Sequence, residues 1–266
     1  MLTLIDLTRR FSGLVAVDGV TMRVAPGTIH AVIGPNGAGK TTLFNLVSGL
    51  LPPSAGRIVI EGTDLTTLAA ERRARLGIAR TFQNIRVFGA MTVLENALTG
   101  LHCGLHAGLA ATILRLPRFR VEERAAVQQA RAALALVGLD ARADRPAREL
   151  SYGDQRRLEI ARAMAPHPRL LLLDEPAAGM NPAETIALAL LVRTLRDQGT
   201  TVLLVEHDMG FVMDISDRVT VMNFGRTIFE GTPEAVRQEP SVIEAYLGPK
   251  VAARLAAGAR AGVRGA

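Results

Sequence analysis

The chain has 266 residues, 48% of them apolar, which is enough to bury a core and argues against disorder. No apolar run reaches the roughly 18 residues that cross a bilayer, and Asp6 interrupts the N-terminus too early for the apolar region of a signal peptide. The net charge of +6 allows anionic partners, but 4% aromatic residues and no Trp disfavour base stacking on nucleic acid. We therefore expect neither a secreted nor a membrane-spanning protein, and no nucleic-acid partner.

Cysteine and lysine are both scarce in this chain. Cys103 is the only cysteine, so no internal disulfide is possible, and we expect it to have a packing role. Lys40 and Lys250 are the only lysines, and every other residue in the Lys+Arg count is arginine. An arginine-rich chain that keeps a lysine indicates a position where a compact ammonium is needed. Lys40 lies in a glycine-rich stretch, which makes it the more informative of the two.

The N-terminal part alternates between strands and one helix. Short β-branched runs bounded by turn residues predict strands, and apolar residues at helical spacing predict a helix after the glycine-rich stretch. In chain order the expected strands are Leu2–Leu7, Val15–Val24, Thr28–Ile33, Arg57–Glu61 and Ile78–Phe82, with a helix at Lys40–Gly49.

The middle and C-terminal parts differ in character. Residues 85–150 are predicted to be mostly helical, with a helix at Glu122–Val137 and a loose stretch at Gly100–Gly108. An alternation of helix and strand then returns, as expected for an α/β core that carries a helical insertion. The expected elements are helices Tyr152–Met164 and Ala183–Gln198 and strands Leu170–Asp174, Thr201–Glu206, Arg218–Asn223 and Arg226–Glu230.

The stretch from residue 34 to residue 41 matches the phosphate-loop pattern G-x-x-x-x-G-K-[ST]. Its glycines allow backbone N–H groups to surround phosphates, and the positive end of the following helix adds to their attraction. Lys40 is predicted to contact the β- and γ-phosphates, and the Thr41 hydroxyl to bind Mg²⁺. The flanking strand and helix make an accidental glycine turn the weaker interpretation. The matching residues are Gly34, Pro35, Asn36, Gly37, Ala38, Gly39, Lys40 and Thr41.

A pair of acidic residues ends the apolar run of four leucines at 170–173. A fully apolar strand is typical of a parallel sheet buried on both faces, and ligands bind at the carboxyl ends of such strands. We expect Asp174 to reach the Mg²⁺ shell and Glu175 to position a water molecule. Solvated acids at the end of a strand are common, but a phosphate loop in the same chain favours the functional interpretation.

A helix start lies about twenty residues before this pair. Ser151 is a good N-cap, and Asp154 is placed to complete a capping-box-like start, which is a sufficient structural explanation. A helix N-terminus with a free hydroxyl and a glycine is also suited to bind an anion. The sequence here is Leu150-Ser151-Tyr152-Gly153-Asp154.

With the phosphate loop, Gln83, this helix start, Asp174-Glu175 and His207 in that order, the chain resembles the ATP-binding-cassette (ABC) ATPases from about Leu2 to Gly248. The family signature is usually Leu-Ser-Gly-Gly-Gln, so Tyr152 and Asp154 depart from it at its third and fifth positions. Further segments resemble the branched-chain amino acid importer subfamily. These are Arg80–Phe88, Met91–Asn96, Leu150–Arg162, Glu175–Pro182 and Val205–Met209.

The resemblance implies a P-loop NTPase core with an antiparallel β subdomain and a helical insertion at about 85–150, all within residues 1–247. It implies ATP and Mg²⁺ as cofactors, with Lys40, Glu175 and His207 in catalysis. Phe11 would stack on adenine, and Thr41, Gln83 and Asp174 would hold the metal. The remaining nucleotide-binding positions would be 34–42, Ser151, Gly153 and Asp154, where Thr42 extends the loop.

The resemblance also implies partners and a location. A second ABC ATPase subunit, identical or different, would complete the ATP site, and two permease subunits would dock on the helical insertion. A periplasmic or extracellular binding protein would take part indirectly, which places the chain at the cytoplasmic face of the membrane. A urea or short-amide importer and a soluble non-transport ABC ATPase remain alternatives, whereas a P-loop kinase would not need Leu150–Asp154.

Most of the net charge belongs to the C-terminal tail, residues 248–266. This segment carries Lys250, Arg254, Arg260 and Arg264 and no acidic residue, so it supplies +4 of the +6. Its Ala, Gly and Arg composition predicts a flexible tail, with anionic lipid as a possible contact. The basic character of the chain is thus mainly a property of the tail.

Overall fold

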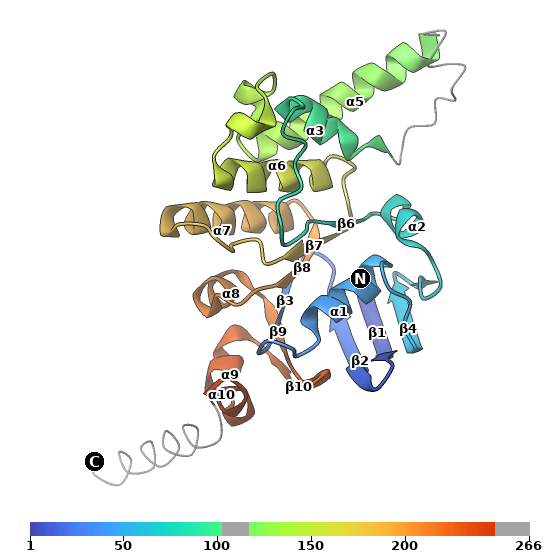
Figure 1. Ribbon diagram of the computed structural model, residues 1–266, viewed down its shortest axis with the longest axis vertical. Coiled ribbons are helices and arrows are strands. Elements are labelled where there is room, and N and C mark those ends of the chain that lie inside the picture. Colours follow the sequence, from blue (N-terminus) through green and yellow to red (C-terminus); the bar gives the residue numbers. More distant parts are fainter. Residues whose placement is uncertain (103–116, 248–266) are drawn as a thin grey trace. The chain divides into compact units, whose positions relative to one another are not determined.

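The computed structural model describes residues 1–102 and 117–247, and the chain divides into two compact units (Figure 1). The first unit comprises residues 1–67 and the chain from Leu203 onward, and the second comprises residues 68–202. The boundary falls within strand β8 (Thr201–Val205), all of whose residues are buried. No helix in the described ranges is both long enough and apolar enough to cross a membrane.

An antiparallel sheet in the order β2-β1-β4-β5 forms one layer of the first unit. Strand β1 pairs with β2 on one side, from Leu2 opposite Val24 to Phe11 opposite Leu14. It pairs with β4 on its other side. Every second residue at the start of β1 is buried, so the sheet has one core face. The strands are β1 (Leu2–Phe11), β2 (Leu14–Val24), β4 (Ala55–Ile60) and β5 (Thr63–Asp64).

The phosphate-loop strand belongs to a second group of strands in the first unit. Strand β3 (Ile29–Ile33) is buried throughout and runs parallel to β9 (Arg218–Asn223), which pairs antiparallel with β10 (Arg226–Gly231). The loop that follows β3 leads into α1 (Lys40–Ser48). Three further helices complete this unit, namely α8 (Met209–Ile215), α9 (Pro233–Gln238) and α10 (Pro240–Leu247).

The second unit contains a pair of parallel strands with helices around them. Strand β6 (Ile78–Arg80) runs beside β7 (Leu170–Asp174), with Ile78 opposite Leu170. All of β7 is buried, in agreement with its apolar sequence. Helix α2 (Ala70–Arg75) precedes β6, and α7 (Pro182–Asp197) follows β7 with a capping box between Asn181 and Glu184.

The remaining helices of the second unit pack on one another. Helix α3 (Val93–Thr99) lies against both α5 (Pro117–Leu136) and α6 (Tyr152–Met164) (Figure 1). Two 3₁₀ turns, Asp140–Arg142 and Ala147–Glu149, connect α5 to α6. Thr92 and Glu95 form a capping box at the start of α3, which gives part of the segment Met91–Asn96 a purely structural role.

The predicted α/β organisation is confirmed, and the helix Tyr152–Met164 and strands Leu170–Asp174 and Arg218–Asn223 agree to the residue. The strand expected at Ile78–Phe82 is shorter and ends at Arg80, because the carbonyls of Phe82 and Gln83 turn toward Arg156. The sequence analysis missed α2, α8, α9 and α10, which are six to eight residues long. Cys103, most of the stretch Gly100–Gly108 and the basic tail lie outside the described residues.

Candidate active site

In the first unit the phosphate loop is a tight turn between β3 and α1. Only glycine fits at position 39 of this turn. Gly39 has a φ of +100°, and a Cβ atom there would lie 2.3 Å from the backbone oxygen of Ala16. A side chain at this position would therefore collide with backbone that cannot move aside. The requirement for glycine thus comes from neighbouring strand β2 as well as from the turn itself.

Lys40 is the first residue of α1 and folds back over this loop. Its Nζ donates hydrogen bonds to the carbonyl oxygens of Gly34, at 2.7 Å, and Pro35, at 3.0 Å. The residue is only 6% exposed although it carries a charge. Because an ammonium has three donors, these bonds hold the cation over the loop backbone, where phosphate oxygens are also expected.

Backbone hydrogen bonds fix the inner side of the loop and leave its outer side accessible. The N–H of Gly225 donates to the carbonyl of Ala38 at 3.0 Å, and the N–H of Asp18 donates to Gly225 at 2.9 Å. Asn36, Gly37 and Thr41 are exposed, whereas Gly34 and Ala38 are buried, and Pro35, Gly39 and Thr42 lie between these classes. The β9–β10 turn therefore holds the loop through Gly225, and β2 holds that turn through Asp18.

Two further predicted residues belong to the first unit. Phe11 ends β1 and is 38% exposed, with the guanidinium carbon of Arg9 lying 4.6 Å from its ring centre. His207 is exposed directly after β8, and its backbone N–H donates to the buried carboxylate of Glu206 at 2.9 Å. Both residues are thus exposed, Phe11 as the last residue of β1 and His207 two residues after the end of β8.

In the second unit Asp174 and Glu175 end strand β7, as predicted, but their settings differ. Asp174 is 4% exposed, and its Oδ2 forms an ion pair with Nη2 of Arg80 at 2.7 Å. The sequence analysis did not foresee this partner. The guanidinium of Arg80 also lies over the ring of Phe82, 5.3 Å from its centre, which ties Asp174 to the segment that leads to Gln83.

Glu175 has an unusual backbone. Its φ is +47°, in the left-handed region that residues with a Cβ seldom occupy. Such strain costs about 1–3 kcal/mol and is found preferentially at functional sites. Its Oε2 accepts a hydrogen bond of 2.7 Å from Nε2 of Gln83, so the structure brings together two residues predicted separately.

The start of α6 agrees with one half of the capping prediction and contradicts the other half. The Ser151 hydroxyl accepts from the N–H of Asp154 at 3.1 Å, as an N-cap should. The carboxylate of Asp154 does not complete the box, because it pairs with Arg142 at 2.5 Å and with Arg157 at 3.6 Å. A Cβ at Gly153 would approach the Glu184 carboxylate to 2.6 Å, so that side chain would have to move.

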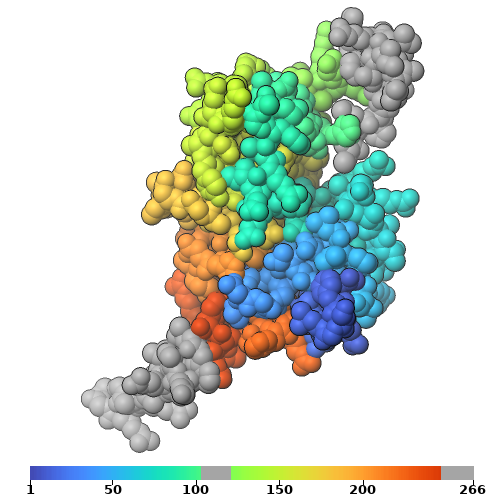
Figure 2. Space-filling model, in the orientation of Figure 1, coloured from blue at the N-terminus to red at the C-terminus, as the bar shows by residue number. Residues whose placement is uncertain are grey.

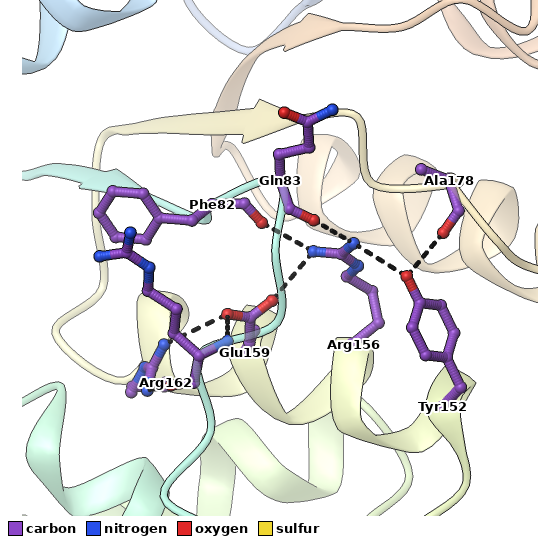
Figure 3. Close-up of polar contacts among 8 residues, drawn as sticks. Phe82, Gln83, Tyr152, Arg156, Glu159, Arg162 and Ala178 are labelled. Atoms are coloured by element: carbon purple, nitrogen blue, oxygen red, sulfur yellow. Dashed lines mark hydrogen bonds and ion pairs between the residues drawn. The ribbon is translucent and has the colours of Figure 1, made fainter.

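A buried charged cluster in α6 is the main feature that sequence reasoning missed (Figure 3). Arg156 and Glu159 have fully buried side chains and form an ion pair of 3.0 Å. Burial raises the pKa of Glu159, opposed by the Arg86 N–H and by the charges of Arg156 and Arg162. The available signal was the opposite-charge spacing i, i+3, which normally indicates a solvated helix face.

Comparison with known proteins gives the family of this chain. The sequence model of the ABC transporter family matches residues 17–178. A second model, for branched-chain amino acid ATP-binding cassette transporters, matches residues 226–248. The first of these covers more than half of the chain and includes the phosphate loop, the start of α6 and the pair Asp174-Glu175.

Individual relatives extend over nearly the whole chain. The branched-chain amino acid transport ATP-binding protein LivG of Escherichia coli is 48% identical over 249 residues, covering 93% of this chain and 98% of LivG. BraF of Pseudomonas aeruginosa, of the same description, is 49% identical over 243 residues, covering 91% and 95%. A crystal structure of a nucleotide-free cassette from an ABC transporter is 33% identical, with a TM-score of 0.82, over 94% of this chain and 99% of that one. The chain therefore belongs to the ABC transporter family, as an ATP-hydrolysing subunit of its branched-chain amino acid group.

Proposed function

We propose that this chain is the energy-coupling ATPase subunit of an importer for branched-chain amino acids, located at the cytoplasmic face of the membrane. The cargo assignment is supported by similarity over 93% of the chain to a subunit that bears this description. The match of residues 226–248 to the subfamily model supports the same group independently of the phosphate loop. Other subunits recognise the cargo, so the residues of this chain act on ATP.

The phosphate loop binds the triphosphate of ATP in this proposal. Backbone N–H groups of residues 34–42 and the N-terminus of α1 attract the phosphate oxygens, and Lys40 supplies the point charge. Phe11 offers its exposed face to the adenine ring. The carbonyl contacts of Lys40 support this role, because they hold its ammonium over the loop.

The donor types present fit Mg²⁺ as the accompanying ion. The residues described by the structure contain no group of three His, Cys, Asp or Glu side chains arranged for a metal. Mg²⁺ does not need such a group, because it takes hard oxygen ligands and relies on substrate phosphates and water for the rest. The Thr41 hydroxyl, the Gln83 amide oxygen and Asp174 are donors of this kind. The ion would neutralise charge that develops on the phosphates.

Glu175 orients the attacking water in the hydrolysis step. The observation that carries this assignment is its strained backbone, at a φ of +47°, together with the 2.7 Å hydrogen bond from Gln83. The bond holds the carboxylate beside the segment that carries Gln83. His207 contacts the γ-phosphate, and most of the rate enhancement comes from positioning and charge stabilisation.

A second ATPase subunit completes the site in this proposal. Ser151 and Gly153, at the N-terminus of α6, face the nucleotide of that partner, and Asp154 takes the place of the usual glutamine. The segment from Gln83 to Phe88 and the helical part of the second unit contact two permease subunits. That segment is on the surface in Figure 2, where it is teal, and Phe88 is 52% exposed.

The substitution Glu175→Gln tests the assigned chemistry. It keeps the size of the side chain but weakens its ability to orient and activate water, so ATP affinity should be retained. We expect phosphate release to fall by at least about a hundredfold. Nucleotide titration and phosphate release measured on the same preparation separate these two effects. Turnover within threefold of the wild type would remove Glu175 from its role.

Purification from membranes tests the transport assignment. We expect two multi-span subunits, a related ATPase and an extracytoplasmic binding protein to accompany the chain. Uptake of labelled leucine by vesicles containing this complex should require ATP and should be lost with Glu175→Gln. Uptake of urea or a short amide instead of leucine, or purification with ribosomes, would contradict the proposed cargo.

A further inference from the structure

Tyr152 and Arg156 lie where three segments of the second unit meet, and the ABC signature has glycine at the position of Tyr152. We propose that these residues are positioning residues for ATP hydrolysis, which link the Gln83 segment to the turn that follows Glu175. The inference rests on the proposed role of Glu175 and adds to it. It concerns how the carboxylate is held, not what the carboxylate does.

The Arg156 side chain binds backbone carbonyls of the segment that contains Gln83 (Figure 3). Its Nη1 donates to the carbonyl of Phe82 and its Nη2 to the carbonyl of Gln83, both at 2.8 Å. Because Arg156 is completely buried, these bonds and the Glu159 carboxylate replace the water that its charge would otherwise require. The guanidinium makes these contacts and the Glu159 ion pair from two nitrogens held at a fixed spacing, and the single nitrogen of a lysine ammonium lacks this geometry.

Helix α6 also binds this segment at a second residue, Arg86. The N–H of Arg86 donates to Oε1 of Glu159 at 2.7 Å, and Arg162 donates to the Arg86 carbonyl at 2.6 Å. Side chains of α6 therefore bind both the backbone N–H and the backbone carbonyl of Arg86. The backbone from Phe82 to Arg86 is held at four points by three side chains of one helix, so α6 and this segment are expected to move together.

Tyr152 reaches the turn after Glu175 from the start of α6. Its hydroxyl donates to the carbonyl oxygen of Ala178 at 2.9 Å. The side chain packs against Gly179, since its hydroxyl oxygen and two ring carbons lie 3.2–3.3 Å from the position that a Cβ of Gly179 would take. A glycine at position 152 could make neither contact. The departure of this chain from the family signature therefore has a structural consequence.

These contacts close a ring around Glu175. Its side chain is bound by Gln83, and the Gln83 carbonyl is bound by Arg156. Nη2 of Arg156 lies 3.5 Å from the Tyr152 hydroxyl, which holds Ala178 three residues beyond Glu175. The N–H of Ala178 in turn donates to the Glu175 carbonyl at 3.2 Å. The strained backbone of Glu175 is thus fixed on both sides, which is what an over-determined active-site conformation needs.

A positioning role predicts that kcat changes while ATP affinity does not. Tyr152→Phe removes one hydroxyl and keeps the ring against Gly179, so the fold should persist. We expect kcat of the complex purified from membranes to fall about tenfold, corresponding to one lost hydrogen bond of ordinary strength. The Kd for ATP should stay within about twofold, because the phosphate loop is untouched. Thr194→Val on α7 of the same unit is the matched control, because it also removes a hydroxyl that donates to a backbone carbonyl at 2.9 Å, that of Leu190, and it should leave kcat unchanged.

A double-mutant cycle separates coupling from local damage. Tyr152→Phe and Arg156→Lys act on one ring of contacts, so their combined effect on kcat should be smaller than the product of the single effects. Arg156→Lys keeps the buried charge and loses one carbonyl contact, and thermal unfolding shows whether each variant is folded.

The outcomes are distinguishable. Loss of turnover in Glu175→Gln with a normal kcat in a folded Tyr152→Phe protein would overturn the positioning inference and leave the proposed function intact. Multiplicative effects of Tyr152→Phe and Arg156→Lys on kcat would overturn it as well. Absence of turnover in the wild-type complex would overturn the inference and the proposed function together.

Discussion

The two units of this chain prepare for nucleotide chemistry in different ways. The first unit builds its phosphate loop from backbone geometry, with Gly39 at a φ of +100° and the Lys40 ammonium on two carbonyls. The second unit holds its proposed catalytic group by side chains, with Glu175 bound by Gln83 and the surrounding segments held by Arg156 and Tyr152. Backbone geometry tolerates almost no change at a few positions, whereas the side-chain network distributes its effect over several partners.

The largest effect is expected from Gly39→Ala. The new Cβ would lie 2.3 Å from the Ala16 oxygen, so the loop must move away from β2. We expect ATP affinity to fall by about a thousandfold, or about 4 kcal/mol, in a nucleotide titration. Gly62→Ala is the control, because Gly62 has a φ of +82° but no atom within 4 Å of its Cβ position. Similar ATP affinities of the two variants would show that a side chain at position 39 does not disturb ATP binding.

The next largest effect is expected on the pH dependence of folding stability, because each unit buries ionisable groups. Arg156 and Glu159 are paired in the second unit, whereas His30 of β3 is 1% exposed and accompanied by Thr220 at 2.7 Å. Burial, with a smaller contribution from Arg218, lowers the pKa of His30 to about 4 from 6.5. The Thr220 hydroxyl in turn donates to Oε2 of Glu230 at 3.4 Å.

The pH dependence follows from the sign of this shift. Between pH 6.5 and 4 the unfolded state binds a proton that the folded state resists, so stability is complete above pH 6.5 and falls as the pH drops toward 4. The loss is on the order of 3 kcal/mol. Urea unfolding at several pH values should show a smaller loss for His30→Gln. Parallel curves for the variant and the wild type would exclude His30 as the source.

Lys40→Arg should have a smaller effect than Gly39→Ala because the charge is kept. A guanidinium is planar and larger than the ammonium that now fits over the Gly34 and Pro35 carbonyls with 6% exposure. We expect ATP affinity to fall about tenfold, or about 1.4 kcal/mol. Lys250→Arg, at the only other lysine, is the chemical control. Full affinity in Lys40→Arg would show that the compact ammonium is not required.

The smallest effect should appear in the stability of two Glu175 variants. Glycine relieves the left-handed backbone at a φ of +47°, and alanine does not, while both remove the contact with Gln83. We expect Glu175→Gly to be more stable than Glu175→Ala by about 1 kcal/mol in urea unfolding. The reverse order would mean that the strain at this residue is negligible. Neither variant should hydrolyse ATP.

Sequence reasoning was most successful where the chemistry depends on the local backbone. The pattern from Gly34 to Thr41 predicted a strand, a loop and a helix that the structure contains, because glycine positions and helix spacing are local properties. The apolar run before Asp174 likewise predicted a buried strand that ends in acids. It could not predict the Arg80 ion pair of Asp174, since 94 residues separate the partners along the chain.

The charged residues of α6 show the opposite case. Arg156, Glu159 and Arg162 have the spacing of a solvated helix face, and charged side chains are seldom fully buried, so the sequence favoured the wrong interpretation. Arg156 and Glu159 are fully buried and Arg162 is partly buried, because the segment Phe82–Arg86 packs on them and supplies backbone partners from 73 to 76 residues away. The tyrosine at position 152 was recognised as a departure from the signature, but its contact with Ala178 was not foreseeable.

The sequence by itself determined the phosphate loop, the order of strands and helices around it, and the family to which the chain belongs. These follow from patterns only a few residues long, in which each residue type acts on its own backbone. Only the tertiary structure decided which residues hold Glu175 and which keep Gln83 in place. Those contacts join side chains that are far apart in the sequence. Whether a charged side chain stabilises the fold depends on its burial and on the partner that it meets there.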